Sequence, residues 1–328
     1  MTFSLPDSWV WDFWTAVDGA TVHLFYLHAP TSLGDPDLRH RNAAIGHATS
    51  TDFVTWVDHG VVLEHGPDGS PDASATWTDS VLRDPAGLWR MYYTGSRFLA
   101  PDDRTNVETV LMAVSDDLFS WTKVPSVAVP ARHPWYETLA DGTWHEEAWR
   151  DPWIVPDPHG EGWHMLVTAR ARHVPDGVDP RDRGVIGHVV SDDLTAWTTT
   201  EPLSAPGAGF AHLEVPQLAT VDDRDVLLFS CDSAHLAGAR RGDRGGIWAL
   251  PVDAERLFTT PVDVREAQLI SGDDLYAGRI VHTPSGPALL GFENTGSAGE
   301  FVGRLADPRP IRWDRHDRLV AAQEEVAP

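Results

Sequence analysis

The sequence contains little of what would indicate a disulfide-bonded, membrane-spanning or nucleic-acid-binding protein. Cys231 is the one cysteine among 328 residues, so no disulfide can form within the chain. Arg, Asp or Pro interrupts every hydrophobic stretch before it is long enough to cross a bilayer. Lys and Arg number 25 against 49 Asp and Glu, and the resulting formal charge of −24 would repel a phosphate backbone. We therefore expect no membrane and no nucleic acid among the partners.

Signals for export and for metal binding are also missing. The N-terminal segment has neither the basic start nor the apolar core of a signal peptide, which favours a cytoplasmic location. The 16 histidines show no His-x-x-x-His spacing, and there is no pair of cysteines, so we expect no metal and no cofactor. The sequence favours no particular oligomeric state.

Turn-forming residues and large aromatic rings are abundant instead. The chain has 27 Gly, 25 Pro and 15 Trp. Frequent Gly and Pro indicate many short elements joined by turns, as in an all-β protein. Indole rings stack on the flat C–H faces of sugars, although they are also ordinary core residues. A small neutral carbohydrate, which is indifferent to the strong negative charge, is therefore the favoured partner.

One phrase, Ser-x-Asp-x-x-x-Trp, occurs three times, over residues 50–56, 115–121 and 191–197. Each copy follows a run of small, alternating residues, which is typical of a strand. We interpret the phrase as an Asp-rich turn that closes a hairpin and returns its Trp to the sheet. A recurrence at this spacing indicates repeated structural units.

A second repeat runs in step with the first. Aromatic and β-branched segments, each after a turn signal, occur at residues 23–27, 89–93, 163–167, 225–229 and 288–292. Each unit has room for about four strands of ordinary length. Radial packing around an axis would bury the faces of such units, whereas a two-sheet sandwich would not explain the repeats. The predicted fold is a single-domain, all-β five-bladed propeller over residues 1–328, with blades at about 9–65, 75–130, 145–205, 210–262 and 270–318. Residues 321–328 are expected to form a polar tail.

Three acidic residues occupy the same place in their units, just before the aromatic segment. They are Asp12, Asp151 and Glu214. The innermost strand of each propeller blade lines the axis, so these side chains should converge although they are far apart in sequence. Taken singly, Asp12 could be an exposed carboxylate on an aromatic strand, and Asp151 could form a structural pair with Arg150. Their shared position favours a site.

These segments resemble those of a known group of enzymes. Trp11-Asp12-Phe13-Trp14 resembles the nucleophile strand of levansucrases, Arg150-Asp151-Pro152 matches the Arg-Asp-Pro motif of glycoside hydrolase families 32 and 68, and Glu214-Val215-Pro216 resembles their acid/base motif. Weaker resemblances to the first, second and fifth blades of these enzymes occur at Gly46-His47-Ala48 with Asp52 and Trp56, at Trp77–Val81 and at Tyr276-Ala277.

The resemblance implies a retaining β-fructofuranosidase that works by double displacement, with possible transfer to sugar acceptors. Asp12 would be the nucleophile, Glu214 the acid/base and Asp151 the residue that stabilises the transition state. In such a pair the acid needs a raised pKa, whereas the nucleophile must stay ionised. The resemblance implies six substrate-binding residues: Trp11, Trp77, Thr78, Arg150, Gln217 and Tyr276.

Three departures from the resemblance bear on substrate choice. No C-terminal β-sandwich of the family 32 type is expected after the fifth blade. The start reads Trp-Asp-Phe-Trp where invertases have Trp-Met-Asn-Asp-Pro-Asn-Gly. Thr78-Asp79 replaces the Ser-Gly of levansucrases and adds a carboxylate near the expected pocket.

Two alternatives stay open at this point. The related five-bladed fold of family 43 also uses three axial carboxylates, which would make the protein an inverting arabinofuranosidase or xylosidase. Arg150 directly before Asp151, together with the Glu-x-Pro motif at Glu214, favours the fructosyl side. A non-catalytic sugar-binding propeller is the other alternative, although binding alone has no need for an acid pair in an aromatic pocket.

Overall fold

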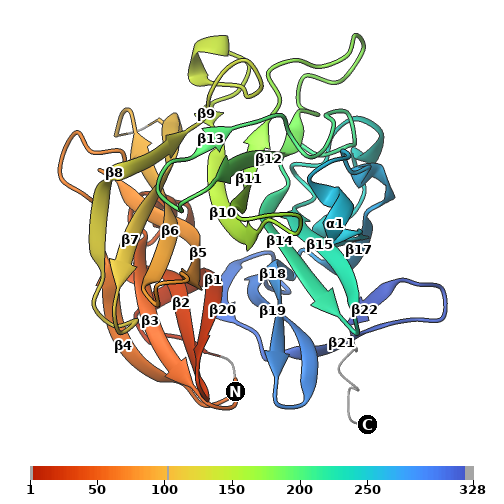
Figure 1. Cartoon of the computed structure of the whole chain (residues 1–328). Helices are drawn as coiled ribbons and strands as arrows, with labels where there is room; N and C mark the ends of the chain where they lie inside the picture. The colour runs from red at the N-terminus through yellow and green to blue at the C-terminus, as the bar shows by residue number, and fades with distance from the viewer. Residues whose placement is uncertain (1–2, 102, 322–328) are drawn as a thin grey trace.

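Five sheets, antiparallel apart from one short strand, follow one another along the chain and surround a common axis (Figure 1). The computed structural model describes residues 3–101 and 103–321, so the expected tail lies outside the described residues apart from Ala321. The all-β five-bladed propeller predicted from the sequence is confirmed.

Each blade is built from consecutive strands, with the first strand innermost. The first blade contains β1 (Ser8–Asp18), β2 (Thr21–Pro30), β3 (Ala44–Ser50) and β4 (Val57–Leu63). The second contains β5 (Ala75–Arg83), β6 (Trp89–Phe98), β7 (Asn106–Ser115), β8 (Thr122–Pro130) and the short β9 (Glu146–Glu147), which pairs with β7 in parallel. The third contains β10 (Trp149–Pro156), β11 (Trp163–Arg170), β12 (Gly184–Ser191) and β13 (Thr198–Thr199).

The last two blades complete the ring. The fourth contains β14 (Glu214–Val221), β15 (Arg224–Cys231), β16 (Gly246–Pro251) and β17 (Gln268–Gly272). The fifth contains β18 (Leu275–Thr283), β19 (Gly286–Thr295), β20 (Phe301–Leu305), β21 (Arg309–Trp313) and β22 (Leu319–Ala321). Within the described ranges, the helical elements are α1 (Ala254–Leu257) and 3-10 turns at Thr31–Leu33, Pro36–Arg41, Leu139–Asp141, Gly238–Arg240 and Val264–Glu266.

The five aromatic segments found in the sequence are the second strands of the five blades, β2, β6, β11, β15 and β19. Two expected boundaries differ from the structure. The fourth blade does not end near residue 262, because β17 pairs with β16 after an excursion through α1. The segment before Trp149 belongs to the second blade, because β9 pairs with β7. Irregular connections interrupt the strand spacing at both places.

The Ser-x-Asp-x-x-x-Trp phrases form three nearly identical turns. In the first, the hydroxyl of Ser50 accepts hydrogen bonds from the backbone of Asp52 and Phe53, and Oδ1 of Asp52 accepts from the backbone of Val54 and Thr55. Phe53 lies in the left-handed region with φ of 61°. The same bonds recur around Asp117 and Asp193.

These turns also join neighbouring blades. The hydroxyl of Tyr92 in the second blade donates to the carbonyl of Leu194 in the turn of the third blade, at 2.5 Å. The ring of Trp121 lies edge-on to Phe25 of the first blade, with centroids 5.6 Å apart. The phrase closes a hairpin in all three copies, and in the second and third it also packs against the preceding blade.

A β-bulge interrupts the innermost strand of every blade at the same level. The register with the second strand shifts between Trp11 and Phe13, Trp77 and Asp79, Arg150 and Trp153, Glu214 and Gln217, and Tyr276 and Arg279. The partners of the residues before the shifts are equivalent as well, because each lies near the end of the second strand. A bulge redirects a side chain out of the regular alternation of a strand.

Candidate active site

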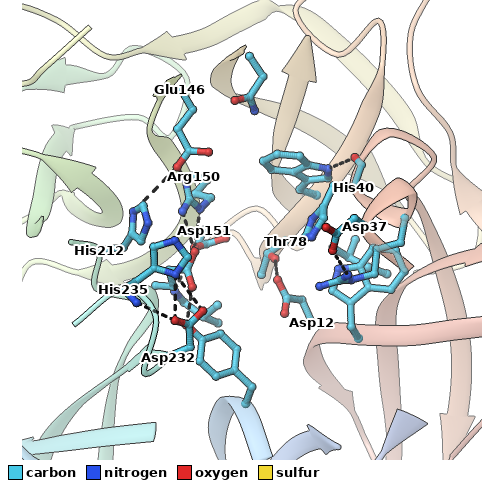
Figure 2. Close-up of a pocket in the computed structure, with 18 of the residues that line it drawn as sticks. Asp12, Asp37, His40, Thr78, Glu146, Arg150, Asp151, His212, Asp232 and His235 are labelled. Atoms are coloured by element: carbon cyan, nitrogen blue, oxygen red, sulfur yellow. Dashed lines mark hydrogen bonds and ion pairs between the residues drawn. The ribbon is translucent and has the colours of Figure 1, made fainter. Parts of the chain in front are cut away.

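The bulges bring side chains from all five blades to a cavity of about 310 Å³ at one end of the axis. Figure 2 shows Asp12 and Thr78 on one side of it, Asp232, His235 and His212 on the other, and Arg150 with Asp151 between them. Eight of the nine sequence-predicted site residues line the cavity: Asp12, Asp151, Glu214, Trp11, Trp77, Thr78, Arg150 and Tyr276.

Asp12 is held by one strong hydrogen bond. The hydroxyl of Thr78, from the equivalent bulge of the second blade, donates to Oδ2 of Asp12 at 2.6 Å. Burial raises the pKa of Asp12 to about 7, and the negative charges of Asp151 and Glu214 act in the same direction. The Thr78 bond opposes this shift because it stabilises the ionised form. The pKa of Asp12 therefore lies well above the usual range of an aspartate.

Asp151 is fixed more tightly. Its Oδ2 accepts from the hydroxyl of Thr168 at 2.7 Å and from the backbone N–H of Val215 at 3.0 Å, while its own N–H donates to Thr94 Oγ1 at 3.0 Å. Its backbone adopts φ of 58°, an uncommon conformation for a residue with a side chain. These bonds from three blades keep Asp151 in the left-handed bulge and orient its carboxylate.

Glu214 lies between a guanidinium and a phenol. Arg150 Nη2 approaches its Oε1 to 2.6 Å, and the hydroxyl of Tyr276 donates to its Oε2 at 2.5 Å. The bulges place these three residues at equivalent positions of the third, fourth and fifth blades. The two carboxyl groups predicted as a pair thus have different environments: Asp12 contacts a neutral hydroxyl, whereas Glu214 contacts a cation.

The guanidinium of Arg150 is surrounded by acidic groups. Its Nη1 lies 3.1 Å from Glu108 and from Glu146, and its Nε lies 3.8 Å from Asp151. Burial alone would lower the pKa of Arg150, but the four neighbouring carboxyls raise it well above its usual value. Arg150 therefore stays positively charged and links Glu214 to the wall of the cavity.

Aromatic rings form much of the remaining wall. The indole N–H of Trp77 donates to the carbonyl of His40 at 2.7 Å, and the imidazole of His40 lies edge-on between Trp77 and Trp11. Arg39 lies 4.0 Å from the centroid of the Phe301 ring. The apolar faces of two tryptophans beside three carboxyls are suited to a sugar ring.

Gln217 is the exception among the predicted site residues. Its amide oxygen accepts from the backbone N–H of Ile280 at 2.7 Å, and its amide nitrogen donates to the carbonyl of the same residue at 3.1 Å. It lies three residues after Glu214, where the regular register resumes, and it does not line the cavity. We therefore correct the expectation of a substrate ligand: Gln217 joins the fourth blade to the fifth.

Several residues that line the cavity were not predicted. Asp37, Arg39, His40 and Arg41 come from the 3-10 turn between β2 and β3, and His145 and Glu146 from the segment before β10. Asp232 and His235 come from the loop after β15, where their side chains form an ion pair of 2.9 Å. Most of these lie in connections between the main strands and Glu146 lies in the short β9, so no repeated strand pattern marked them.

We also looked for metal-binding clusters and for membrane-spanning helices in the described residues. Within residues 3–101 and 103–321, no cluster of three or more His, Cys, Asp or Glu side chains is arranged to hold a metal ion. No helix in these ranges is both long enough and apolar enough to pass through a membrane.

A five-bladed propeller whose axial cavity collects acidic side chains from several blades is an architecture of glycoside hydrolases. Residues 16–315 match the model of the N-terminal domain of glycosyl hydrolases family 32. The chain therefore belongs to this family.

Individual relatives are distant in sequence. Sucrose-6-phosphate hydrolase of Escherichia coli is 26% identical over 264 residues, which is 78% of this chain and 48% of that protein. Raffinose invertase of Escherichia coli is 27% identical over 66% of this chain and 40% of its own length. The chain thus spans about half the length of the curated relatives it matches.

Solved structures agree in fold. An inulosucrase from Halalkalicoccus jeotgali superimposes with a TM-score of 0.72 at 22% identity, covering 97% of this chain and 87% of that one. A β-fructofuranosidase from Bombyx mori superimposes with a TM-score of 0.71 at 18% identity, covering 99% of this chain and 64% of that one.

Proposed function

We propose that the protein is a retaining β-fructofuranosidase that cleaves sucrose or short fructo-oligosaccharides by double displacement. The observation that carries the proposal is the convergence of Asp12, Asp151 and Glu214 from three blades on one cavity walled by Trp11 and Trp77. The raised pKa expected for the acid is found at Asp12 instead. The roles of nucleophile and acid/base are therefore assigned from the motifs that hold the two carboxyls, not from their ionisation.

In the first step, the carboxylate of Asp12 attacks the anomeric carbon of the fructosyl unit while the glycosidic C–O bond breaks. Glu214 donates its proton to the departing oxygen, so the leaving group departs as a neutral alcohol. In the second step, Glu214 takes a proton from water, the water oxygen bonds to the anomeric carbon, and the ester bond to Asp12 breaks.

Asp151 and Arg150 act on charge and position. The carboxylate of Asp151 binds sugar hydroxyls and stabilises the positive charge that develops on the ring in the transition state. Arg150 holds Glu214 by the 2.6 Å contact, and Tyr276 holds its other oxygen. Thr78 keeps Asp12 oriented through the 2.6 Å hydrogen bond.

The names of related proteins support a fructoside substrate. One relative is a sucrose-6-phosphate hydrolase and another a raffinose invertase, while solved neighbours include an inulosucrase bound to kestose and a β-fructofuranosidase in complex with sucrose. We propose a small fructoside for this chain as well. Transfer of the fructosyl unit to a sugar hydroxyl in place of water would follow from the same covalent intermediate.

The test is to incubate the protein and its Asp12→Asn variant with sucrose, kestose and an aryl arabinofuranoside. Release of fructose by the wild type alone, with the β-anomer appearing first by NMR, is the expected result. Release of arabinose with inversion would assign the protein to the family 43-like alternative. Binding of sucrose without any release would identify a sugar-binding propeller.

A further inference from the structure

Glu108 is a fully buried carboxyl that the proposed mechanism does not use. It lies on β7, the third strand of the second blade, and its side chain is 0% exposed. Although it starts from a strand remote from the axis, its carboxyl reaches the catalytic strand β10 of the next blade. A buried acidic side chain at such a place requires partners, because its desolvation is costly.

The partners of Glu108 are adjacent residues of β10. Both carboxyl oxygens lie 3.1 Å from Nη1 of Arg150, and Oε2 also accepts the backbone N–H of Trp149 at 2.8 Å. Asn106 Nδ2 donates to Oε1 at 3.3 Å. Glu108 thus binds the side chain of Arg150 and the backbone of the preceding residue, which fixes the guanidinium relative to its own strand.

The opposite end of the same guanidinium holds Glu214. Nη2 of Arg150 is 2.6 Å from Glu214, whereas Nη1 is shared by Glu108 and Glu146. The single positive charge of Arg150 therefore interacts with several carboxyl groups at once. The more of this charge Glu108 neutralises, the less of it stabilises an ionised Glu214.

We propose that Glu108 is a positioning residue for the fructosidase reaction: by holding Nη1 of Arg150, it sets both the place of the guanidinium and the strength of its hold on Glu214. The inference rests on the proposed function, since it assigns to Glu214 the role of proton donor. Glu108 itself does not line the cavity.

Protonation of Glu108 makes the interaction between Arg150 and Glu214 depend on pH. Burial raises the pKa of Glu108 to about 8, and Glu146 adds to the rise while Arg150 opposes it. Above this pH, an ionised Glu108 draws on the charge of Arg150, so less of that charge acts on Glu214. Other charged or titratable groups face the network: Asp151, His145, His212, Tyr276, Asp232 and His235.

The experiment measures kcat and kcat/KM for sucrose from pH 5 to 10 in the wild type and in Glu108→Gln. Glutamine keeps the size of the side chain but cannot ionise. Above about pH 8, where wild-type Glu108 is ionised, we expect kcat/KM of the variant to fall at lower pH than that of the wild type. The acid limb should stay in place because Glu108 does not contact Asp12. We also expect a fall of about 10-fold or more in kcat at the optimum, since small displacements of catalytic groups are costly.

Asp84→Asn is the matched control. Asp84 is also a buried carboxyl of the second blade that accepts a backbone N–H, from Leu88 at 2.9 Å, and binds a guanidinium, Arg90, at 2.9 Å. It does not line the cavity. We expect this variant to lose stability without any movement of the pH profile.

Two outcomes overturn the proposal. One is a Glu108→Gln variant with a lower Tm but both limbs at the wild-type positions. If Glu108→Gln does not fold, Glu108→Asp replaces it, since aspartate keeps the charge but is one methylene shorter. A lower kcat with the alkaline limb retained is expected there, and an unchanged kcat overturns the proposal. A wild-type protein that releases no fructose would instead contradict the proposed function.

Discussion

The hairpin turns and the axial bulges are both repeated structures, but they repeat in different ways. In the three Ser-x-Asp turns, the backbone geometry and the residues that produce it recur together. In the five bulges, the register shift recurs while the bulge itself holds Asp12, Thr78, Asp151, Val215 and Ala277. Three of these residues lie in the left-handed region with φ of 49° to 58°.

This difference separates structural from chemical roles. A turn that needs a particular set of hydrogen bonds keeps the side chains that form them, so sequence and geometry repeat together. A bulge is defined by its backbone, so its side chain can differ from blade to blade. The propeller therefore provides five equivalent positions around one cavity, and three of them carry polar side chains, those of Asp12, Thr78 and Asp151.

The largest effect is expected for the bulge of the first blade. Asp12→Asn should lower kcat/KM for sucrose by at least about 10³-fold, because an amide cannot form the covalent intermediate. The same variant should be more stable than the wild type at pH 8. The pKa of Asp12 is raised from 3.8 to about 7, so its ionisation opposes folding as pH rises through this range.

Thermal unfolding at pH 5 and pH 8 checks the second part of this prediction. The gain in Tm of Asp12→Asn should be larger at pH 8, where wild-type Asp12 is ionised in the folded state. A Tm below that of the wild type at both pH 5 and pH 8 would show that Asp12 stabilises the fold, as the aspartates of the Ser-x-Asp turns do.

A smaller, substrate-dependent effect is expected at the fourth blade. Glu214→Gln should reduce sucrose cleavage by about 10²- to 10⁴-fold, because the leaving group would no longer receive a proton. An aryl fructoside, whose phenolate leaves without protonation, should retain most of its first-step rate, which a burst of phenol release would measure. Equal losses on both substrates would remove Glu214 from the role of acid.

A substitution in the bulge of the second blade should shift the pH dependence of kcat/KM rather than abolish activity. The hydrogen bond from Thr78 lowers the pKa of Asp12, which burial raises to about 7. In the wild type, kcat/KM should therefore fall as the pH drops below about 7, since the nucleophile becomes protonated. Thr78→Val removes the hydroxyl and should move this acid limb to higher pH, with little change above pH 9. A limb at the wild-type position would contradict the link between Thr78 and Asp12.

The smallest effect on catalysis is expected for the turns. Ser191→Ala removes the acceptor for the backbone N–H groups of Asp193 and Leu194, at 3.2 and 2.9 Å. Loss of such a capping bond costs about 1 kcal/mol of unfolding free energy, which denaturant titration can measure. The kcat and KM of this variant for sucrose should equal those of the wild type. A large loss of kcat would show that the turns affect the active site.

Most of the fold could be predicted from the sequence, because short-range signals repeat along it. The turn phrases and the five aromatic strands are local patterns, and their spacing predicts the number of blades. The same logic found Asp12, Asp151 and Glu214, although the structure places Asp12 and Asp151 in the bulge and Glu214 one position before it. Patterns of this kind failed for Gln217, which shares the strand of Glu214 but lies beyond the bulge and bonds to Ile280.

Tertiary structure decided what surrounds the predicted carboxyls. Glu108 reaches Arg150 from β7, and Asp232 with His235 reaches the cavity from a loop, so no spacing in the sequence connects them to the predicted carboxyls. The ionisation of Asp12 also depends on burial and on charges from distant blades. The sequence by itself determined the repeating strands, the turns and the catalytic candidates, because these depend on neighbours along the chain. Only the closed ring decided how charge and protons are shared among the candidates, because electrostatic interactions depend on distance in space.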